Sequence, residues 1–215
     1  MYIDQFLSNH PQIKISKTVL MLCKVGETKM RNSIDPLHDE HHIGRLLNNL
    51  KFFLKKHKNH QKINFEILLL SICWHDVWKA KRQTLNPIKL IYYQLYEGIG
   101  SLLIFSKNSV GLLPNDIIAE VNYAIRKHSQ FQLFSLTSIE SKILKDIDDL
   151  DVLNPKRMRY LLSKANSVNK FTKQFGKSWL KILANKKTTN RLEFEWSRKK
   201  SQKINYFVNK IIRSF

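Results

Sequence analysis

Three observations together predict a folded chain of the all-α class. Only 6 glycines and 5 prolines interrupt the chain, so long stretches run without a residue that breaks a helix. Hydrophobic residues make up 43% of the sequence and aromatic residues 11%, which is typical of a folding chain rather than a disordered one. The length of 215 residues suffices for one domain with a sizeable core, with or without an appendage. We therefore expect a helical bundle.

The first helices are expected at 17–31, 40–57 and 63–75. Asp39 is placed to cap the second of these, because an aspartate just before a helix accepts hydrogen bonds from the free amides of the first turn. The helix at 63–75 is apolar on nearly every side, which predicts a central position in the core.

Downstream, residues 79–87 are expected to form a polar loop. Further helices are expected at 88–106, 116–128, 138–150, 155–168, 172–185 and 191–213. Gly98 and Gly100 lie inside the first of them, and each costs about 1 kcal/mol relative to alanine, so they indicate close helix packing or the close approach of a ligand. Thr137 and Glu140 have the spacing of a capping box.

The net charge of +20 is concentrated towards the C-terminus. Residues 1–151 hold 20 Lys and Arg against 15 Asp and Glu, whereas residues 152–215 hold 17 against 2. We therefore expect one domain at 1–153 and a basic helical extension at 154–215 packed on it. Such asymmetry indicates an anionic partner for the extension, and a basic surface that is simply solvated is the alternative.

The sequence also bears on location. The first residues lack the basic and apolar segments of a signal peptide, and the longest apolar stretch, 88–105, carries Lys89 and Glu97. We therefore expect no membrane span. Cys23 and Cys73 lack the spacing of a metal site and are expected to be reduced, buried thiols in a cytoplasmic protein.

The adjacent pair His75 and Asp76 closes the apolar run of the third expected helix. A polar pair that can bind a cation thus stands where a buried segment ends. Other such residues occur along the chain, at His42, His128 and Asp148. Neutral imidazole together with carboxylate is a ligand set that suits Zn, Mn, Fe or Mg.

In this order, and over about residues 35–155, the sequence resembles the HD-domain superfamily of metal-dependent phosphohydrolases. His42–Leu46 looks like the family's His-x-x-Arg-aliphatic segment, and Val121–His128 is similar to its Val-x-x-Ala-Ile-x-x-His pattern. Asp146–Asp151 resembles its Asp-Ala-Asp-x-Leu-Asp segment. The resemblance implies an HD-domain-like helical bundle at 1–153, to which the basic C-terminal helices are an addition.

The resemblance also implies a site that holds one divalent metal ion, with Mn, Mg, Fe, Co, Ni and Zn as the candidates. Carried over, the metal ligands are His42, His75, Asp76 and Asp148. His38 or His41 could replace His42, and Asp146 or Asp149 could replace Asp148. Asp76 and His128 are the candidate catalytic residues, with His128 directed at the substrate phosphate or a metal-bound water. The candidate phosphate-binding cations are Arg45, Lys79, Lys81, Arg82 and Lys127.

The sequence departs from the family in two places. Lys79 keeps a lysine that many members have three residues after the aspartate, but Trp78 stands where many members have a glycine, two residues after it. Two-metal members carry a further histidine in the next helix, and here Tyr96 and Glu97 occupy that region. A dinuclear site is therefore less expected, although Glu97 could contribute a carboxylate.

The expected activity follows from the resemblance. A bound divalent cation lowers the pKa of its water from about 15.7 to about 7, so the enzyme would cleave a phosphoester or phosphoanhydride of a nucleotide-like substrate with a metal-activated water. The alternative is a nucleic-acid-binding helical protein that uses the C-terminal region, with a reduced or auxiliary HD site. Its candidate stacking aromatics, which helical spacing also allows in a core, are Trp179, Phe194, Trp196, Tyr206 and Phe207.

Overall fold

The structure is a computed structural model. It describes residues 1–33, 38–57, 62–82, 87–128, 135–152 and 192–213, with the single positions 154, 155, 157, 159, 174 and 178. This part of the chain is all-helical and contains no strand, which confirms the expected fold class. The helices expected at 155–168 and 172–185 lie almost entirely outside the described residues.

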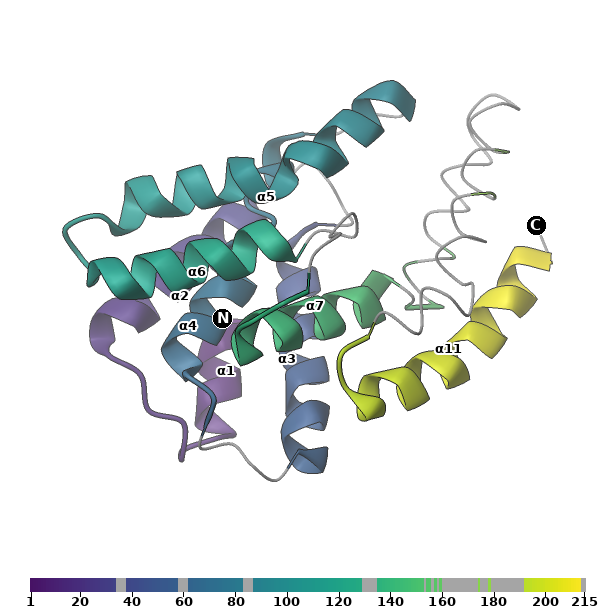
Figure 1. The fold of residues 1–215 in the computed structure, drawn as a ribbon, viewed down its shortest axis with the longest axis horizontal. Helices are drawn as coiled ribbons and strands as arrows, with labels where there is room; N and C mark the ends of the chain where they lie inside the picture. The colour runs from purple at the N-terminus through teal and green to yellow at the C-terminus, as the bar shows by residue number, and fades with distance from the viewer. Residues whose placement is uncertain are drawn as a thin grey trace.

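The helices follow one another as in Figure 1. Their bounds are α1 Tyr2–Ser8, α2 Lys17–Arg31, α3 Glu40–Lys56, α4 Phe65–Trp74, the short 3-10 helix η2 Lys79–Lys81, α5 Pro87–Ser109, α6 Asn115–Lys127, α7 Ile139–Val152 and α11 Glu195–Arg213. The expectation for α2 is confirmed residue for residue, and that for α3 to within one residue. Asp39 caps α3, because its carboxylate accepts a hydrogen bond of 3.0 Å from the His42 amide. Helices α1 and η2 are additions to the expected set.

Helix α7 begins with a different cap from the one expected. Ser138, not Thr137, is the capping residue, since its Oγ accepts a hydrogen bond of 3.2 Å from the Ser141 amide. The Glu140 carboxylate instead accepts a 2.7 Å hydrogen bond from the Asn64 amide, at the start of α4. A carboxylate expected to close its own helix thus ties α7 to α4.

Helix α4 is the centre of the bundle. It contacts α2, α3, α5, α6 and α7, and all its residues from Ile67 to Trp74 are buried. The Trp74 indole N–H donates to the Leu22 carbonyl oxygen at 2.9 Å, which fixes the end of α4 against α2. Because α4 ends at Trp74, the two residues that follow, His75 and Asp76, are delivered to the protein interior.

Close packing accounts for both glycines of α5. A Cβ atom at Gly98 would lie 3.0 Å from the Arg126 carbonyl oxygen of α6. A Cβ atom at Gly100 would lie only 2.0 Å from the Trp78 ring. Helix α5 therefore needs glycine to approach α6 and Trp78 this closely. Although α5 spans 23 residues, none of the described helices combines the length and apolarity needed to cross a membrane.

Helix α11 lies against α7 and α3 (Figure 1). Its approach is fixed by Asp146 of α7, whose carboxylate accepts hydrogen bonds from the Glu193 amide at 2.8 Å and the Phe194 amide at 2.9 Å. Helix α11, the last part of the basic region, thus packs on α3 and α7. Elsewhere in the core, Cys23 and Cys73 are both free and buried.

Candidate metal centre

Four side chains from three neighbouring helices turn their polar ends towards one another. They are His42 on α3, His75 and Asp76 at the end of α4, and Asp148 on α7. One nitrogen or oxygen of each lies within 4.8 Å of those of the other three, and all four residues are buried. We call them the histidine–aspartate cluster. The structure therefore brings together the four residues that the resemblance named as ligands.

The Nδ1 nitrogens of both cluster histidines form hydrogen bonds outside the cluster. His42 Nδ1–H donates to Asp151 Oδ2 at 2.8 Å, and His75 Nδ1–H donates to the Ile72 carbonyl oxygen at 2.9 Å. Burial lowers the pKa of His42, but the Asp151 and Asp76 carboxylates raise it above its ordinary value overall. While both rings are neutral, only one nitrogen of each carries a hydrogen, so both Nε2 atoms are then acceptors. They face each other at 3.1 Å.

The carboxylates of the cluster add further acceptors at the same point. Asp76 Oδ2 lies 3.3 Å from each of the two Nε2 atoms, and Asp148 Oδ1 lies 3.4 Å from His42 and 3.9 Å from His75. Asp76 Oδ1 is buried without a hydrogen-bond partner among the described residues. Buried acceptors that face one another without a donor are unfavourable, and a cation between them removes the cost. This set of nitrogen and oxygen ligand atoms therefore fits a divalent metal ion.

Asp76 is held in its charged form. Burial alone would raise its pKa, but the Lys79 ammonium above all, together with the neighbouring histidine rings, keeps the pKa well below the usual range. The Lys79 ammonium forms an ion pair with Glu97 and lies 3.7 Å from Asp76 Oδ1. Burial would lower the pKa of Lys79, and the two carboxylates raise it above its ordinary value. The site therefore contains a fixed ammonium beside a fixed carboxylate.

A second group of possible ligands shares Asp76 with the cluster and adds Glu97 and His128. His128 Nε2 lies 3.7 Å from Asp76 Oδ1 and 3.9 Å from Glu97 Oε1, and its Nδ1–H donates to the Ile125 carbonyl oxygen. Burial opposes protonation of His128, but the carboxylates outweigh it and raise the pKa to about 9. The Lys79 ammonium already neutralises the charge of Glu97, so in this second group a side-chain cation occupies the place that a metal ion would take.

The sequence left three histidines, His38, His41 and His42, as alternatives for one ligand position, and they lie in different places in the structure. His41 points away, and its Nδ1 meets the Tyr2 hydroxyl at 2.6 Å on the exposed side of α3. His38 lies at the edge of the site, with Nε2 3.6 Å from Asp76 Oδ2 and 3.1 Å from Arg157 Nη2. Of the three, His42 is the one inside the cluster.

The aspartates of α7 separate in the same way. Asp146 accepts the two backbone amides before α11, although burial raises its pKa to about 6. Asp149 pairs with Lys145, whose Nζ lies 2.6 Å from its Oδ2. Asp148 is therefore the residue of this run that faces the two histidines.

Asp151 forms a layer behind the cluster. Besides His42, its carboxylate accepts hydrogen bonds from Arg45 Nε at 2.7 Å and from Arg157 Nη1 at 2.9 Å. Burial opposes ionisation, but these donors hold the pKa of Asp151 well below the usual range. An ionised partner fixes the tautomer and orientation of a ligating histidine. Sequence reasoning missed Arg157, and no local pattern marks it.

The five candidate phosphate-binding cations occupy different places. Lys79 lies beside the cluster, and Arg45 is bound to Asp151 one layer behind it. Lys81 and Arg82 line a groove between α2 and α5 and make no contact with the cluster in the described structure. Lys127 is half-buried at the end of α6.

No protein-family model, curated protein or solved structure matches this chain. The chemistry of the centre therefore follows from its own ligand atoms. Two imidazoles and two carboxylates suit several divalent metals, including Zn, Mn and Fe, and do not select one. Four protein ligands would fill a tetrahedral zinc ion, whereas an octahedral ion such as Mn or Mg would keep two positions for water or a substrate.

Proposed function

We propose that the chain is a metal-dependent phosphohydrolase of the HD-domain type, with one divalent ion held by His42, His75, Asp76 and Asp148. Its substrate is a phosphoester or phosphoanhydride of a nucleotide-like molecule. The observation that carries the proposal is the meeting of two imidazole nitrogens and two carboxylate oxygens, all from buried residues of α3, α7 and the end of α4. When bound, a divalent ion supplies Lewis acidity and lowers the pKa of its water to about 7.

The chain's own residues would bind and orient the substrate. Lys79 Nζ and His128 Nε2 are the nearest hydrogen-bond donors on the side of Asp76 away from the two histidines. Both are fixed by neighbours, Lys79 by Glu97 and His128 by the Ile125 carbonyl oxygen. Donors fixed in advance stabilise charge on a phosphoryl group without reorganising during the reaction. We therefore assign Lys79 and His128 to the phosphate.

The test is metal content measured on the same samples as hydrolysis of a panel of phosphoesters and nucleotides. The wild type is compared with His75→Ala and Asp76→Asn after reconstitution with each candidate metal. His41→Ala is the matched control, because His41 adjoins His42 on α3 but faces Tyr2. We expect about one equivalent of metal and measurable hydrolysis in wild type and control, and neither in the two variants. Full metal content and activity in His75→Ala would contradict the proposal.

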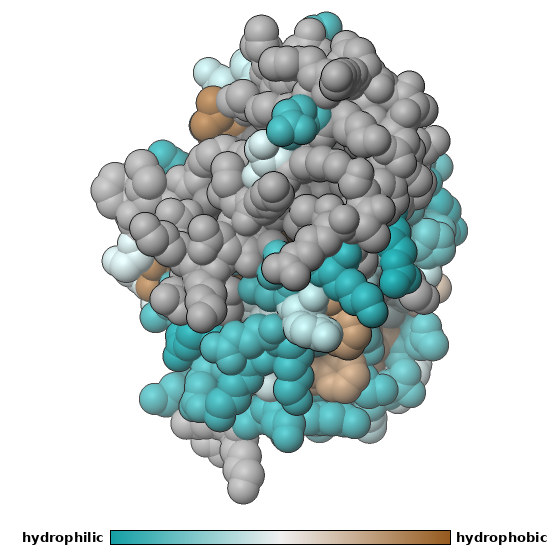
Figure 2. All heavy atoms as spheres, turned by 90° about the vertical axis from the view of Figure 1, so that its right-hand side faces the viewer, coloured by the Kyte–Doolittle hydropathy of each residue, from teal (hydrophilic) through white to brown (hydrophobic). Residues whose placement is uncertain are grey.

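A second candidate function is nucleic-acid binding by the C-terminal region. The observation in its favour is that Tyr206 and Phe207 on α11 are 72% and 56% exposed. Phe194 and Trp196 instead pack against Phe53, and Trp179 lies outside the described residues. In the lower half of Figure 2, which views the side where α11 lies, most of the coloured side chains are hydrophilic, with a small apolar patch among them.

The assay for the second candidate is binding of a labelled oligonucleotide. Tyr206→Ala and Phe207→Ala remove the exposed rings while leaving the charge of α11 unchanged. Stacking contributes about 1–3 kcal/mol per base, so a weakening of about fivefold or more is expected if these rings stack on bases. Unchanged affinity would remove α11 as a base-stacking surface.

A further inference from the structure

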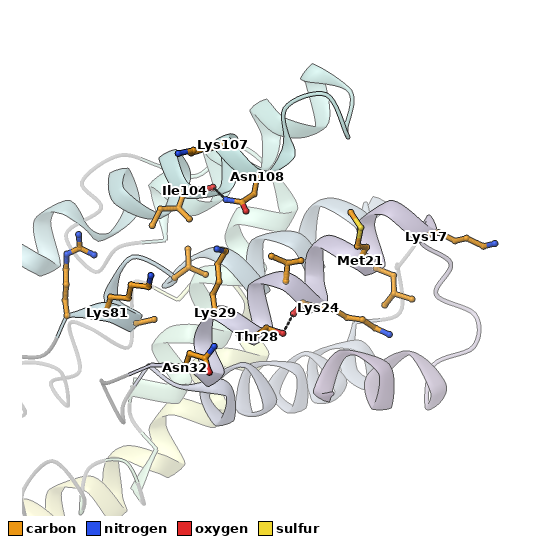
Figure 3. A pocket seen from close by; sticks show the side chains of 15 residues that line it. Lys17, Met21, Lys24, Thr28, Lys29, Asn32, Lys81, Ile104, Lys107 and Asn108 are labelled. Carbon is orange, nitrogen blue, oxygen red and sulfur yellow. Dashed lines mark hydrogen bonds between the residues drawn. The ribbon is translucent and has the colours of Figure 1, made fainter.

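A large groove lies between α2, the segment 77–82 and α5 (Figure 3). Its volume is about 1,100 Å³. Ile104 and Asn108 point from α5 towards α2, while Lys29 and Lys81 point towards α5 from the opposite side. Pockets for a single small molecule measure about 300–1,000 Å³, so the groove has room for several units of an extended ligand. We call it the basic groove.

The charge of the groove has one sign. Six of its fifteen lining residues are lysine or arginine and none is acidic: Lys17, Lys24, Lys29, Lys81, Arg82 and Lys107. Three of these have partners in the structure: Lys24 forms a 2.8 Å ion pair with Asp4, Arg82 stacks 3.7 Å from the centre of the Trp78 ring, and Lys29 Nζ lies 5.9 Å from the centre of the Trp74 ring. Cations from three separate elements that line one hollow create a positive potential that favours an anionic ligand.

The floor of the groove is apolar, and this selects among anions. It includes Leu20, Met21 and Val25 of α2 and Ile104 of α5, and Met21 is 46% exposed. An inorganic polyphosphate or an acidic peptide with a fully charged face offers nothing to cover this floor. A single nucleic-acid strand offers both parts, with phosphates for the cations and flat base faces for the apolar surface. We propose that the basic groove binds single-stranded nucleic acid.

The groove is separate from the metal centre. Within the segment that follows α4, Asp76 and Lys79 face the histidine–aspartate cluster, whereas Val77, Ala80 and Lys81 line the groove. The two sites thus lie on opposite sides of one short piece of backbone. The inference therefore does not depend on the proposed phosphohydrolase activity, and a nucleic acid bound here is a partner at a second site.

The experiment measures binding of a fluorescein-labelled 12-nucleotide poly-dT to the full chain by anisotropy, from 50 to 300 mM salt. The groove variant is Lys29→Glu/Lys81→Glu/Lys107→Glu. The matched control, Lys55→Glu/Lys56→Glu/Lys62→Glu, makes the same charge change at exposed positions outside both the groove and α11. Single-strand binding has a log–log salt slope of about −0.7 per phosphate contacted. We expect the groove variant to bind at least tenfold more weakly with a slope flatter by about 2, and the control to stay within twofold of wild type.

Four outcomes would overturn the inference: no binding by wild type at 50 mM salt, equal losses in the two triple variants, a larger loss in the control, or no loss in either. Displacement of the strand by inorganic polyphosphate or poly-glutamate, at the same concentration of anionic groups as unlabelled poly-dT, would overturn the choice of nucleic acid. If circular dichroism shows that the groove variant is unfolded, the Lys→Gln versions of both triples are compared by the same criteria.

Discussion

His42 Nε2 and His75 Nε2 face each other at 3.1 Å, and each ring has already committed its Nδ1 hydrogen to a fixed acceptor. Two neutral imidazoles in this arrangement present lone pair to lone pair. A proton shared by the two nitrogens, or a metal ion between them, removes this repulsion. The nearby carboxylates of Asp76 and Asp148 favour a divalent metal ion over a single proton, because it carries the larger positive charge.

Metal binding should stabilise the protein, because the cluster is assembled only in the folded state. At a free metal concentration of 100 times Kd, the free energy of unfolding rises by about 2.7 kcal/mol. In a chain of this size that corresponds to an increase in Tm of about 5–10 °C. Calorimetry of the chelated protein before and after adding metal measures the shift. His75→Ala should show almost none of it, and a shift of full size in that variant would place the metal elsewhere.

Asp151→Asn should weaken metal binding without removing a ligand. Asparagine can still accept the His42 Nδ1 hydrogen, but it lacks the charge that makes the ring a stronger donor. Loss of such a partner typically costs 10–100-fold in metal affinity. Asp149→Asn is the matched control, because this neighbour on α7 pairs with Lys145 rather than with His42. Competition with a metal indicator compares the two, and equal losses would show that general charge, not the contact with His42, sets the affinity.

Two aspartates of α7, two residues apart, should have opposite effects. Asp148→Ala removes a cluster carboxylate, so metal content should fall while Tm of the metal-free protein changes little. Asp146→Ala leaves the Glu193 and Phe194 amides without their acceptor, so the free energy of unfolding should fall by about 1–3 kcal/mol with metal content kept. Metal analysis and denaturant unfolding give both quantities. The reverse pattern would make Asp146 the ligand.

Phosphate binding by His128 predicts a loss of rate without a loss of metal. His128 reaches the site through Asp76 and Glu97 and is not one of the four cluster residues. Loss of one fixed donor to a charge that develops in the reaction typically costs about 10²–10³-fold in rate. His128→Gln should therefore lower hydrolysis by about that factor at wild-type metal content. A variant that loses its metal together with its activity would make His128 a ligand.

The sequence predicted well the parts of the molecule that local patterns control. The bounds of α2 and the cap by Asp39 follow from apolar spacing and from one side chain near the helix start. It predicted poorly what depends on contacts between distant segments. Helix α1 has only 7 residues, and its Tyr2 amide is held by the buried Glu27 carboxylate, 25 positions away.

The candidate site shows the same division. The resemblance named the four cluster residues, and the structure brings them together. Asp151 and Arg157 support His42 from 109 and 115 positions away, the latter through Asp151. No spacing rule links residues so far apart, and only the packing of α3 on α7 places Asp151 beside His42. The placement of Lys81 and Arg82 in a groove outside the cluster depends likewise on how η2 packs against α5.

Gly100→Ala should destabilise the fold although alanine favours helix. Replacing glycine by alanine within a helix is favourable by about 1 kcal/mol. The new Cβ, however, would lie 2.0 Å from the Trp78 ring, and overpacking costs about 1–3 kcal/mol or more. Trp78 is tied to α5 by a 3.2 Å hydrogen bond from its amide to Ser101 Oγ and lies between Asp76 and Lys79. Displacing the ring should therefore lower both Tm and metal affinity. Leu103→Ala, at a position of α5 that is 61% exposed, should change neither, and a stabilised Gly100→Ala would contradict the packing of α5 on Trp78.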